Sequence, residues 1–573
     1  MIPQQPTKNK IVPVIVLKGK VFSGKDHGEA IEKAQKAGHD ISGVDRERDG
    51  KFMVGIDVYT RKEALKKFGI SHSHEINQPK VLVISDEWLA PSLALKIKNE
   101  GCNVFVALKR PTNILKGTIR RIPYEERLEY AKMCDLVIYE DKSNNNESSD
   151  LRATGVSVIG GDKLTDKLEL DRLWGNKLAS LSGLKVPEMI PIDSFEQVRD
   201  IIRVRGGKWV LKQCGKIDEI KGLSFVAKMD NSEDLLDFLP ILEKEWVDSV
   251  KKDFVLQEKV EGHEFAVGGY WNGHEFMKDE EGDEIIEQNW EHKALFPGNL
   301  GESTGEQYTV MQYMKAKDSK LFMETLDKCR ELLKGIDFRG DFDINTIVNE
   351  KGAYFLEFTP RMGVPATSAQ LEIQKSSWYE FLKACADGTQ PKNYKYDPRM
   401  CIVSWLYTKP FPAVFSDDGV NENPSGLEEI KKTISTRMSN SEGIKLNFKK
   451  DFTKEDWSHI HPDGIRFKDG RLEVANTDGY VLTATAMDDT VEGAGAKLEE
   501  LFKKIVLPKA FWRNDFDKTN YHKSKDDLLK WGYLMTEEQK NGKIKEREQE
   551  KVNKEKQKRK EIREKLKKIV YAK

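Results

Sequence analysis

Two acidic residues at the ends of neighbouring predicted strands are the first candidates for chemistry. The segments Asp343–Val348 and Ala353–Phe358 have strand character and are joined by a short turn ending in Gly352. In such a hairpin Asp343 and Glu357 lie at the same end, so their carboxylates can converge. Two carboxylates, with water and phosphate oxygens, suit Mg²⁺. The spacing therefore predicts a magnesium site, with a surface hairpin carrying solvated acids as the alternative.

A lysine near the end of a short apolar strand is the second candidate. Lys212 lies in the segment Lys208–Gln213, and a loop with two glycines, Cys214–Val226, follows it. The lysine can contact a phosphate that the loop covers. Most single strand lysines are instead solvated, so both interpretations stay open at this point.

The third candidate is an acidic segment between two further predicted strands. One strand ends at Gln257 and Glu258, a turn follows at Gly262, and Glu264 begins the next strand. An extended backbone offers adenine one N–H and one C=O, and a carboxylate can accept hydrogen bonds from ribose hydroxyls. This segment is therefore a candidate nucleotide site.

These candidates follow a region that predicts a small α/β unit. Helical segments such as Leu93–Lys98 alternate with four apolar runs of buried-strand length: Val81–Ser85, Cys102–Leu108, Leu136–Tyr139 and Val156–Gly161. Alternation of this kind favours a parallel sheet with right-handed crossovers.

Length and composition bound the class of protein. The chain has 573 residues, more than one compact domain usually contains. Its longest apolar runs fall far below the roughly 18 residues of a membrane span, and it opens with no secretory signal pattern. Its six cysteines stand singly, without a Cys-x-x-Cys pair, which argues against a zinc ribbon and a disulfide scaffold. We expect a soluble cytoplasmic protein.

Composition and motifs divide the chain into five parts. These are a leader module 1–78, an α/β domain 80–166, the longest domain 167–391 with a lid of about 204–268, a further domain 393–517 and a basic helical tail 518–573.

The two ends of the chain differ in charge from its body. Residues 540–573 contain 15 basic and 6 acidic residues, whereas the whole chain has a net charge of −1. The body is therefore acidic, which argues against nucleic-acid binding by it. The tail is a solvated helix, a nucleic-acid arm or an oligomerising coiled coil. In the leader, a helix is predicted at Tyr59–Ile70. It belongs to a docking or packing module, with the first helix of a helix-turn-helix as the alternative.

In their order and spacing the three candidate features resemble the ATP-grasp fold, and more narrowly the phosphoribosylamine–glycine ligase family. The resemblance covers about Lys80 to Asp517, and its closest motifs are Trp290–Lys293, Gly298–Gly305, Leu356–Gly363, Gly479–Val491 and Phe511–Asp515. It implies an α/β and α+β multidomain protein, with an N-terminal parallel-sheet (pre-ATP-grasp) domain before the ATP-grasp domain.

The resemblance also implies roles for individual residues, with ATP and Mg²⁺ (or Mn²⁺) as cofactors and glycine and phosphoribosylamine as small-molecule substrates. ATP contacts fall on Arg172, Lys212, Gln257, Glu258, Val260 and Glu264. Metal ligands fall on Asp343, Glu357 and Asn345, and contacts with phosphates, substrate or intermediate on His292, Lys293 and Arg361.

Two departures from the family pattern concern the metal and the substrate. Thr359 replaces an asparagine of the metal motif, and Asn345 can compensate for it. The loop Ser85–Pro91 stands where the family has a glycine-rich loop that binds the substrate phosphate. It contains Asp86 and Glu87 and no arginine, and two acids repel a phosphate.

Three functions stay open. The first is phosphoribosylamine–glycine ligation, in which ATP converts a carboxylate into an acyl phosphate that an amine attacks under a closed lid. The second is the same chemistry on another acid or amine, favoured by the altered loop. The third is a catalytically degenerate ATP-grasp body used for binding or assembly.

Overall fold

The computed structural model describes residues 78–536, apart from 87, 111, 143–144, 215–223, 246–253, 410 and 412–440. Outside that range it describes residues 538, 539, 542 and 545 and an antiparallel hairpin of β1 (Val14–Leu17) and β2 (Lys20–Ser23). Most of the leader, with its predicted helix, therefore lies outside the described residues, as does most of the tail from residue 537 onward, whereas residues 518–536 of the tail are described.

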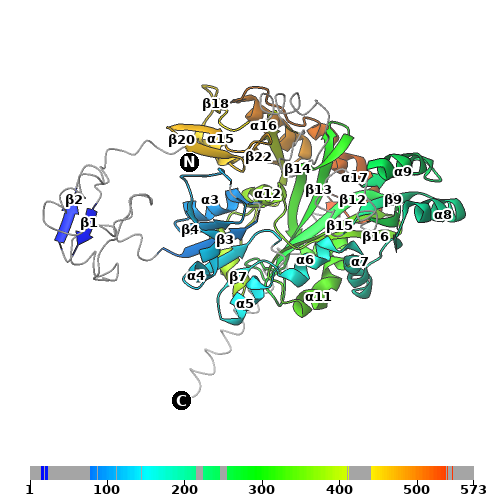
Figure 1. Ribbon diagram of the computed structural model, residues 1–573, viewed down its shortest axis with the longest axis horizontal. Helices are drawn as coiled ribbons and strands as arrows, with labels where there is room; N and C mark the ends of the chain where they lie inside the picture. Colours follow the sequence, from blue (N-terminus) through cyan, green and yellow to red (C-terminus); the bar gives the residue numbers. More distant parts are fainter. Residues whose placement is uncertain are drawn as a thin grey trace, which may run out of the picture.

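The first described unit is a parallel sheet, as the alternating pattern predicts (Figure 1). Its strand order is β5-β4-β3-β6-β7, with helices α3 (Pro91–Asn99), α4 (Arg127–Ala131) and α5 (Glu147–Ala153) in the connections. The strands are β3 (Lys80–Ser85), β4 (Asn103–Leu108), β5 (Arg120–Ile122), β6 (Leu136–Tyr139) and β7 (Val158–Ile159). The central strands are buried on both faces, which explains their unbroken apolar sequence.

A second unit, at the opposite end of the molecule in Figure 1, carries Lys212. Its antiparallel sheet has the order β10-β9-β11-β8, and helices α8 (Phe195–Arg205) and α9 (Glu233–Glu245) pack on it. The strands are β8 (Met189–Pro191), β9 (Trp209–Gln213), β10 (Phe225–Val226) and β11 (Phe254–Glu258). Helices α6 (Lys163–Leu170) and α7 (Arg172–Leu181) lead into this unit from the parallel sheet.

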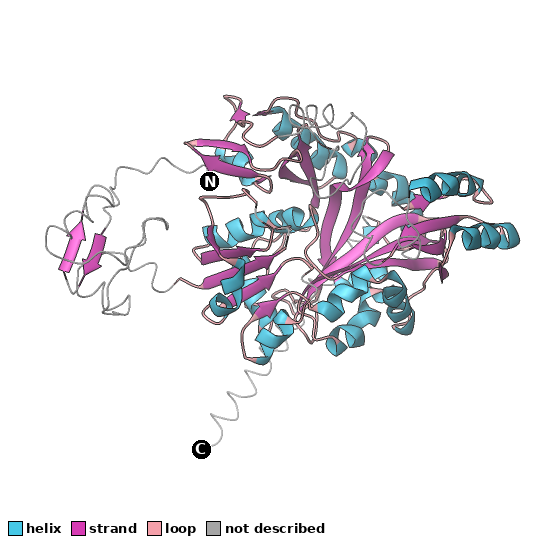
Figure 2. Cartoon of the chain, viewed as in Figure 1, coloured by secondary structure: helices cyan, strands magenta, loops and turns pink. Residues whose placement is uncertain are grey.

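An eight-stranded antiparallel sheet forms the centre of the molecule (Figure 2). Its strand order is β16-β15-β12-β13-β14-β17-β22-β19. The strands are β12 (His263–Trp271), β13 (Ile285–Phe296), β14 (Leu300–Lys315), β15 (Gly340–Asn349), β16 (Gly352–Thr359), β17 (Met400–Tyr407), β19 (Ile460–His461) and β22 (Tyr480–Asp488). The last three come from the predicted domain 393–517, so that part of the chain shares a sheet with the part before it.

The two faces of this sheet have different surroundings. One face forms the largest apolar core with the packed helices α10 (Lys320–Glu324), α11 (Arg330–Gly335), α16 (Val491–Lys503) and α17 (Asn520–Lys530). The other packs partly against α3, α12 (Ala366–Ile373) and α13 (Trp378–Ala386). The remaining part of this second face, on β12, β13, β15 and β16, carries polar side chains.

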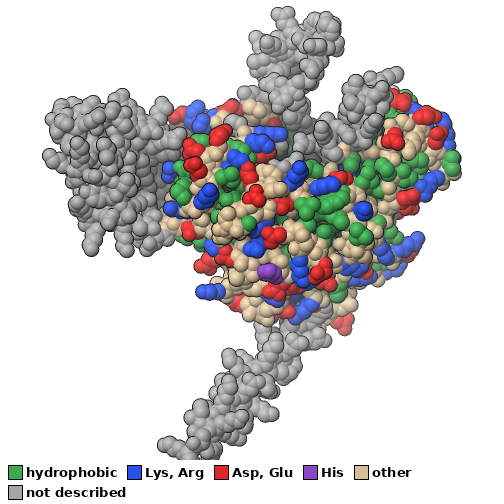
Figure 3. Space-filling model, turned by 60° about the horizontal axis from the view of Figure 1, so that its bottom comes forward, with side chains coloured by type: hydrophobic (Ala, Val, Ile, Leu, Met, Phe, Trp, Pro, Cys, Tyr) green, Lys and Arg blue, Asp and Glu red, His purple; other side chains and the backbone are tan. Residues whose placement is uncertain are grey.

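The remaining helix and strand pairs come from residues 447–506, the same part of the chain that contributes β19 and β22 to the sheet. They are α15 (Lys454–Ser458) and the two-stranded pairs β18 (Asn447–Phe448) with β23 (Ile505–Val506) and β20 (Ile465–Lys468) with β21 (Arg471–Val474). No helix among the described residues has the length and apolar character that a bilayer crossing needs. Charged side chains of both signs are intermixed over the face shown in Figure 3.

Candidate active site

The predicted metal residues come together on the hairpin of β15 and β16. The register pairs Asp343 with Thr359 and Asn345 with Glu357. Residues two apart on a strand share a face, so these four side chains leave the sheet on the same side. A Cβ at Gly268, on the neighbouring β12, would lie 2.8 Å from Asp343 Oδ2, so glycine leaves the space that this carboxylate occupies.

Lys293, on β13, lies at the centre of the acidic side chains. Its Nζ is 2.8 Å from Glu264, 2.8 Å from Glu291 and 3.7 Å from Glu357. Burial disfavours the charged lysine, but these carboxylates outweigh it and hold the pKa of Lys293 well above its ordinary value. Lys293 is therefore a fixed cation beside the predicted metal residues.

Arg172 brings a second cation to the same place. It is the first residue of α7, and its Nη1 lies 3.0 Å from Glu357 Oε2. Burial opposes ionisation of Glu357, yet Lys293 and Arg172 hold the pKa of its carboxyl well below the ordinary range. Glu357 is therefore an ionised carboxylate with cations on two sides.

Lys212, on β9, faces this cluster from the second sheet. Burial, with Arg172 as the next cause, lowers the pKa of Lys212 to about 8, while Glu357 and Glu264 act in the opposite direction. Lys212 has no ion pair with any residue that the structure describes. A half-buried ammonium that forms no ion pair with a described residue is suited to an anionic ligand.

The oxygen atoms around Asp343 suit a divalent cation. Asp343 Oδ1 and Asn345 Oδ1 are buried and have no hydrogen-bond partner in the described structure. Burial, then Glu291 and Asp341, raises the pKa of Asp343 well above its ordinary value, and Asn289 and Lys293 oppose this only in part. Together with Glu357 these atoms form a set of hard oxygen ligands, so the residues present fit Mg²⁺ or Mn²⁺.

Further acids beside this set were not identified from the sequence. Glu306, on β14, has a buried oxygen without a described partner, and burial and Glu291 raise its pKa well above the ordinary value. Behind Asp343, Gln370 Nε2 donates hydrogen bonds to Glu287 at 3.0 Å and to Asp341 at 2.9 Å. Glu287 and Glu306 could have been indicated only by the alternation of charged residues along β13 and β14, and such alternation is common on solvated strands.

A separate acidic group is occupied by a lysine. Oxygen atoms of Asp279, Glu281 and Asp283 lie within 4.8 Å of one another. The Lys315 ammonium, only 7% exposed, forms ion pairs with all three carboxylates. The lysine takes the position that a metal ion would need.

The predicted adenine segment lies at the end of β11. Gln257 is buried, Glu258 is exposed, and Val260 follows outside the strand. The Glu258 N–H donates to the carbonyl of Glu188 at 2.9 Å, which fixes the strand end beside the edge strand β8. Glu264, at the start of β12, is bound to Lys293 and so joins this segment to the cluster.

His292 does not join the cluster. It alternates with Lys293 along β13 and therefore points to the opposite face, where it stacks on Tyr308 with ring centroids 3.8 Å apart. The backbone N–H of Asn520 donates to His292 Nε2 at 2.7 Å. Burial, with Arg513 as the next cause, lowers the pKa of His292 to about 3, so the ring is neutral.

Arg361 is near the cluster but is already paired. Its guanidinium makes hydrogen bonds to both oxygens of Glu169, at 2.9 Å from Nη2 to Oε1 and 3.2 Å from Nε to Oε2. Lys142 Nζ lies 3.6 Å from the same carboxylate. An anion that binds Arg361 must therefore compete with Glu169.

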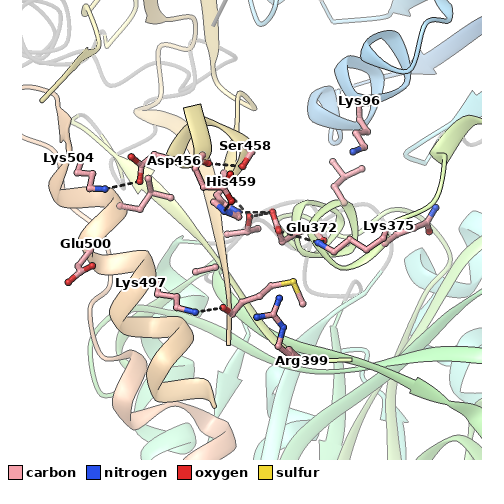
Figure 4. Close-up of a pocket in the computed structure, with 17 residues that line it drawn as sticks. Lys96, Glu372, Lys375, Arg399, Asp456, Ser458, His459, Lys497, Glu500 and Lys504 are labelled. Carbon is pink, nitrogen blue, oxygen red and sulfur yellow. Dashed lines mark hydrogen bonds and ion pairs between the residues drawn. The ribbon is translucent and has the colours of Figure 1, made fainter. Parts of the chain in front are cut away.

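A cavity of about 670 Å³ lies elsewhere, between α12, α15, α16 and Lys96 of α3 (Figure 4). None of the predicted site residues lines it. Several of its charged side chains pair with one another: His459 Nδ1 lies 3.1 Å from Glu372, and Lys504 Nζ lies 2.8 Å from Asp456. This cavity is distinct from the cluster around Lys293.

Comparison with known proteins gives distant relatives. No protein-family model matches the chain. It is 22% identical over 345 residues to phosphoribosylamine–glycine ligase of Clostridium acetobutylicum, covering 56% of this chain and 79% of the relative. It is 19% identical over 377 residues to that of Caldanaerobacter subterraneus subsp. tengcongensis, covering 63% and 79%.

Solved structures give the same fold. The crystal structure of phosphoribosylamine–glycine ligase from Thermotoga maritima matches with a TM-score of 0.56 and 18% identity, over 76% of this chain and 99% of that one. The biotin carboxylase domain of Hydrogenobacter thermophilus 2-oxoglutarate carboxylase, solved with MgADP, matches with a TM-score of 0.51 and 12% identity, over 80% and 99%. The chain therefore has the ATP-grasp fold and is a distant relative of the phosphoribosylamine–glycine ligases.

Proposed function

We propose that this chain is an ATP-dependent carboxylate–amine ligase that forms an amide through an acyl phosphate, the type of reaction that phosphoribosylamine–glycine ligases perform in purine biosynthesis. The observation that carries the proposal is the cluster in which Lys212, Arg172 and Lys293 surround the carboxylate of Glu357. Cations from two sheets and a helix meet oxygen ligands there, as transfer of a phosphoryl group requires.

ATP is proposed to lie between the sheet of β9 and β11 and the polar face of the central sheet. The segment Gln257–Val260 is the proposed adenine site, with Glu258 near the exocyclic amine and Glu264 near the ribose. Lys212 and Arg172 are the proposed phosphate contacts. The half-buried ammonium of Lys212, which forms no ion pair with a described residue, supports this placement, since a phosphate would supply a direct ion pair.

Asp343, Asn345 and Glu357 are the proposed ligands of Mg²⁺ (or Mn²⁺). The metal ion would neutralise charge on the transferred phosphoryl group. Thr359, opposite Asp343, lies within the same set as a weaker ligand.

The residues of the chain then act by position and charge. Lys293 and Arg172 hold Glu357 ionised and stabilise negative charge that develops on the phosphate oxygens. The acid substrate attacks the γ-phosphorus of ATP, the bond to ADP breaks, and the acyl phosphate forms. The amine then attacks the acyl carbon, phosphate leaves with the bonding electrons, and the amine loses a proton. The lid, about 204–268, is proposed to exclude water during this interval.

Arg361 is proposed to orient the acid substrate or its acyl phosphate, in exchange for part of its contact with Glu169. We leave His292 outside the proposed contacts because its side chain points to the other face of the sheet. Glycine and phosphoribosylamine, named by the relatives, are the reference substrates. Because ATP and amino acids are cytoplasmic metabolites, we propose a cytoplasmic location.

Trapping of the acyl phosphate tests this proposal directly. Hydroxylamine converts an acyl phosphate into a hydroxamate without any need for the natural amine. We expect hydroxamate and ADP to form together from Mg²⁺-ATP and glycine or another amino acid, and Lys212→Ala to abolish both. Binding of Mg²⁺-ATP without hydroxamate from any acid would instead support a binding or assembly protein.

A further inference from the structure

The loop that follows β3 is built differently from an anion-binding loop. Three of its described backbone N–H groups donate to side chains of the chain itself. The Asp86 N–H donates to Asp141 Oδ2 at 2.8 Å, the Trp88 N–H to Ser85 Oγ at 2.6 Å, and the Ala90 N–H to Glu140 Oε2 at 3.1 Å.

The two carboxylates come from the end of the neighbouring strand β6 and are buried. Glu140 is fully buried and Asp141 is 8% exposed. The Ser85 hydroxyl also donates to Asp141, at 2.7 Å. Internal carboxylates thus accept the hydrogen bonds that an external phosphate would otherwise accept.

The cations around this loop are also committed. Lys109 pairs with Asp86 at 2.7 Å, and the guanidinium of Arg121 donates to the carbonyls of Thr112 and Ile114 while lying over the Trp88 ring. The indole of Trp88 is buried and fills space at the same strand end. The described cations Lys109 and Arg121 are thus paired with groups of the chain, and the donors at this loop without a described partner, Trp88 Nε1 and Arg121 Nε, are buried.

This loop borders the proposed active site. The Met362 N–H donates to the Glu140 carbonyl at 3.3 Å, which joins the end of β6 to the segment that carries Arg361. Arg361 in turn is paired with Glu169, close to Glu357. A substrate bound between Arg361 and the parallel sheet therefore lies beside the loop whose N–H groups Glu140 and Asp141 hold from within.

We propose that the amine substrate of this chain is unphosphorylated, a neutral or cationic amine, and that Asp141 and Glu140 exclude the phosphate group. This inference rests on the proposed ligase function and narrows its second substrate. It predicts that the chain prefers an amine without a phosphate group over the same amine with one.

Two amines that differ only in the phosphate provide the test. With the acid that gives the highest hydroxamate yield, ADP release is compared for ribosylamine and phosphoribosylamine, both freshly prepared. We expect kcat/KM for ribosylamine to equal or exceed that for phosphoribosylamine. A preference of about tenfold or more for phosphoribosylamine would overturn the inference while leaving the ligase function intact, because the hydroxamate assay reports that function separately.

Binding gives a readout that does not depend on turnover. With Mg²⁺-ADP present to fill the nucleotide site, ribose 5-phosphate should not raise the melting temperature of the full chain. Asp141→Ala frees the Asp86 N–H and removes a negative charge, so we expect this variant to gain stabilisation by ribose 5-phosphate but not by ribose. Asp150→Ala, an exposed site on α5 of the same unit, is the matched control.

Stabilisation of the unmodified chain by ribose 5-phosphate, beyond that by ribose, would contradict the proposal. Should Asp141→Ala fail to fold, the comparison of the two ligands and the two amines on the unmodified chain still decides the matter.

Discussion

Arg172 Nη1 and Glu357 Oε2 lie 3.0 Å apart, so the first turn of α7 is tied to β16, the second strand of the hairpin that carries the proposed metal ligands. The two residues are 185 positions apart in the sequence. The ion pair gives the proposed phosphate contact and the proposed metal ligand a common position, before either ligand binds.

Loss of Arg172 should therefore weaken both nucleotide binding and catalysis. We expect Arg172→Ala to lower kcat/KM for ATP about 100-fold, the size typical for removal of one preorganised electrostatic contact. Steady-state ADP release measures it. Arg205→Ala, which removes an exposed ion pair with Glu188, should leave kcat/KM within about twofold, and an equal loss there would argue against a specific role for Arg172.

The Mg²⁺ concentration that ADP binding requires should rise when Glu357 is changed. Glu357→Gln removes the ionised ligand, and we expect the concentration of Mg²⁺ needed for half-maximal ADP binding to rise at least about tenfold. Titration calorimetry at several Mg²⁺ concentrations measures this shift. Glu350→Gln changes an exposed acid in the turn of the same hairpin and serves as control; unchanged Mg²⁺ dependence in Glu357→Gln would refute the assignment.

Nucleotide affinity should fall at alkaline pH because of Lys212. Its pKa is lowered to about 8, so the free protein loses the positive charge as pH rises through that value. Since the phosphate binds the charged form, the affinity for ADP should be constant below about pH 7 and decline up to about tenfold per pH unit above pH 8. Lys212→Arg, which stays charged, should flatten the profile; an identical decline in that variant would assign the titration to another group.

The acidic triad around Lys315 should become a cation site when the lysine is removed. Lys315→Met leaves three clustered carboxylates without their counter-ion, and we expect a loss of about 3 kcal/mol in the free energy of unfolding. Added Ca²⁺ should recover part of that loss in the variant and have no such effect on the unmodified chain. Chemical denaturation with and without Ca²⁺ tests this, and a variant insensitive to Ca²⁺ would show that the carboxylates separate or protonate.

The ion pair of His459 and Glu372 should make stability depend on pH. The hydrogen bond that protonated His459 donates to Glu372 raises the pKa of His459. The stability that His459 contributes is therefore present below about pH 6.5 and is lost as pH rises through the pKa of the folded state. Burial opposes ionisation of Glu372, but His459 lowers the pKa of Glu372 to about 2. The stability that Glu372 contributes is therefore present above about pH 4.3 and is lost as pH falls toward 2.

His459→Ala should therefore destabilise the chain most between about pH 4.5 and 6.5, by about 1–3 kcal/mol. Urea denaturation at pH 5.5 and pH 8.5 measures the difference. A destabilisation of equal size at both pH values would show that packing rather than charge accounts for the effect.

Local patterns predicted the strands well because burial is visible in the sequence. The apolar runs of β3, β4 and β6 and the turn between β15 and β16 each depend on neighbouring residues, and the structure has them within a few positions. That Asp343 and Glu357 lie on one face of the sheet follows from the hairpin alone.

Contacts between distant segments could not be predicted in this way. The pairing of Arg361 with Glu169 spans 192 residues, and nothing near either residue indicates it. The motif Trp290–Lys293 predicts a shared site for His292 and Lys293, whereas adjacent residues of a strand point to opposite faces. Glu306 was missed because a single acid on a strand is normally solvated.

The order of strands in the central sheet has a consequence for engineering. Because β17, β19 and β22 continue the sheet beyond β14, a chain truncated near residue 390 would leave β14 as a long open edge. Such edges invite aggregation. Attempts to trim this protein to a minimal nucleotide-binding fragment should therefore yield insoluble material, whereas shortening it from the other end, before β3, leaves every strand of that sheet paired.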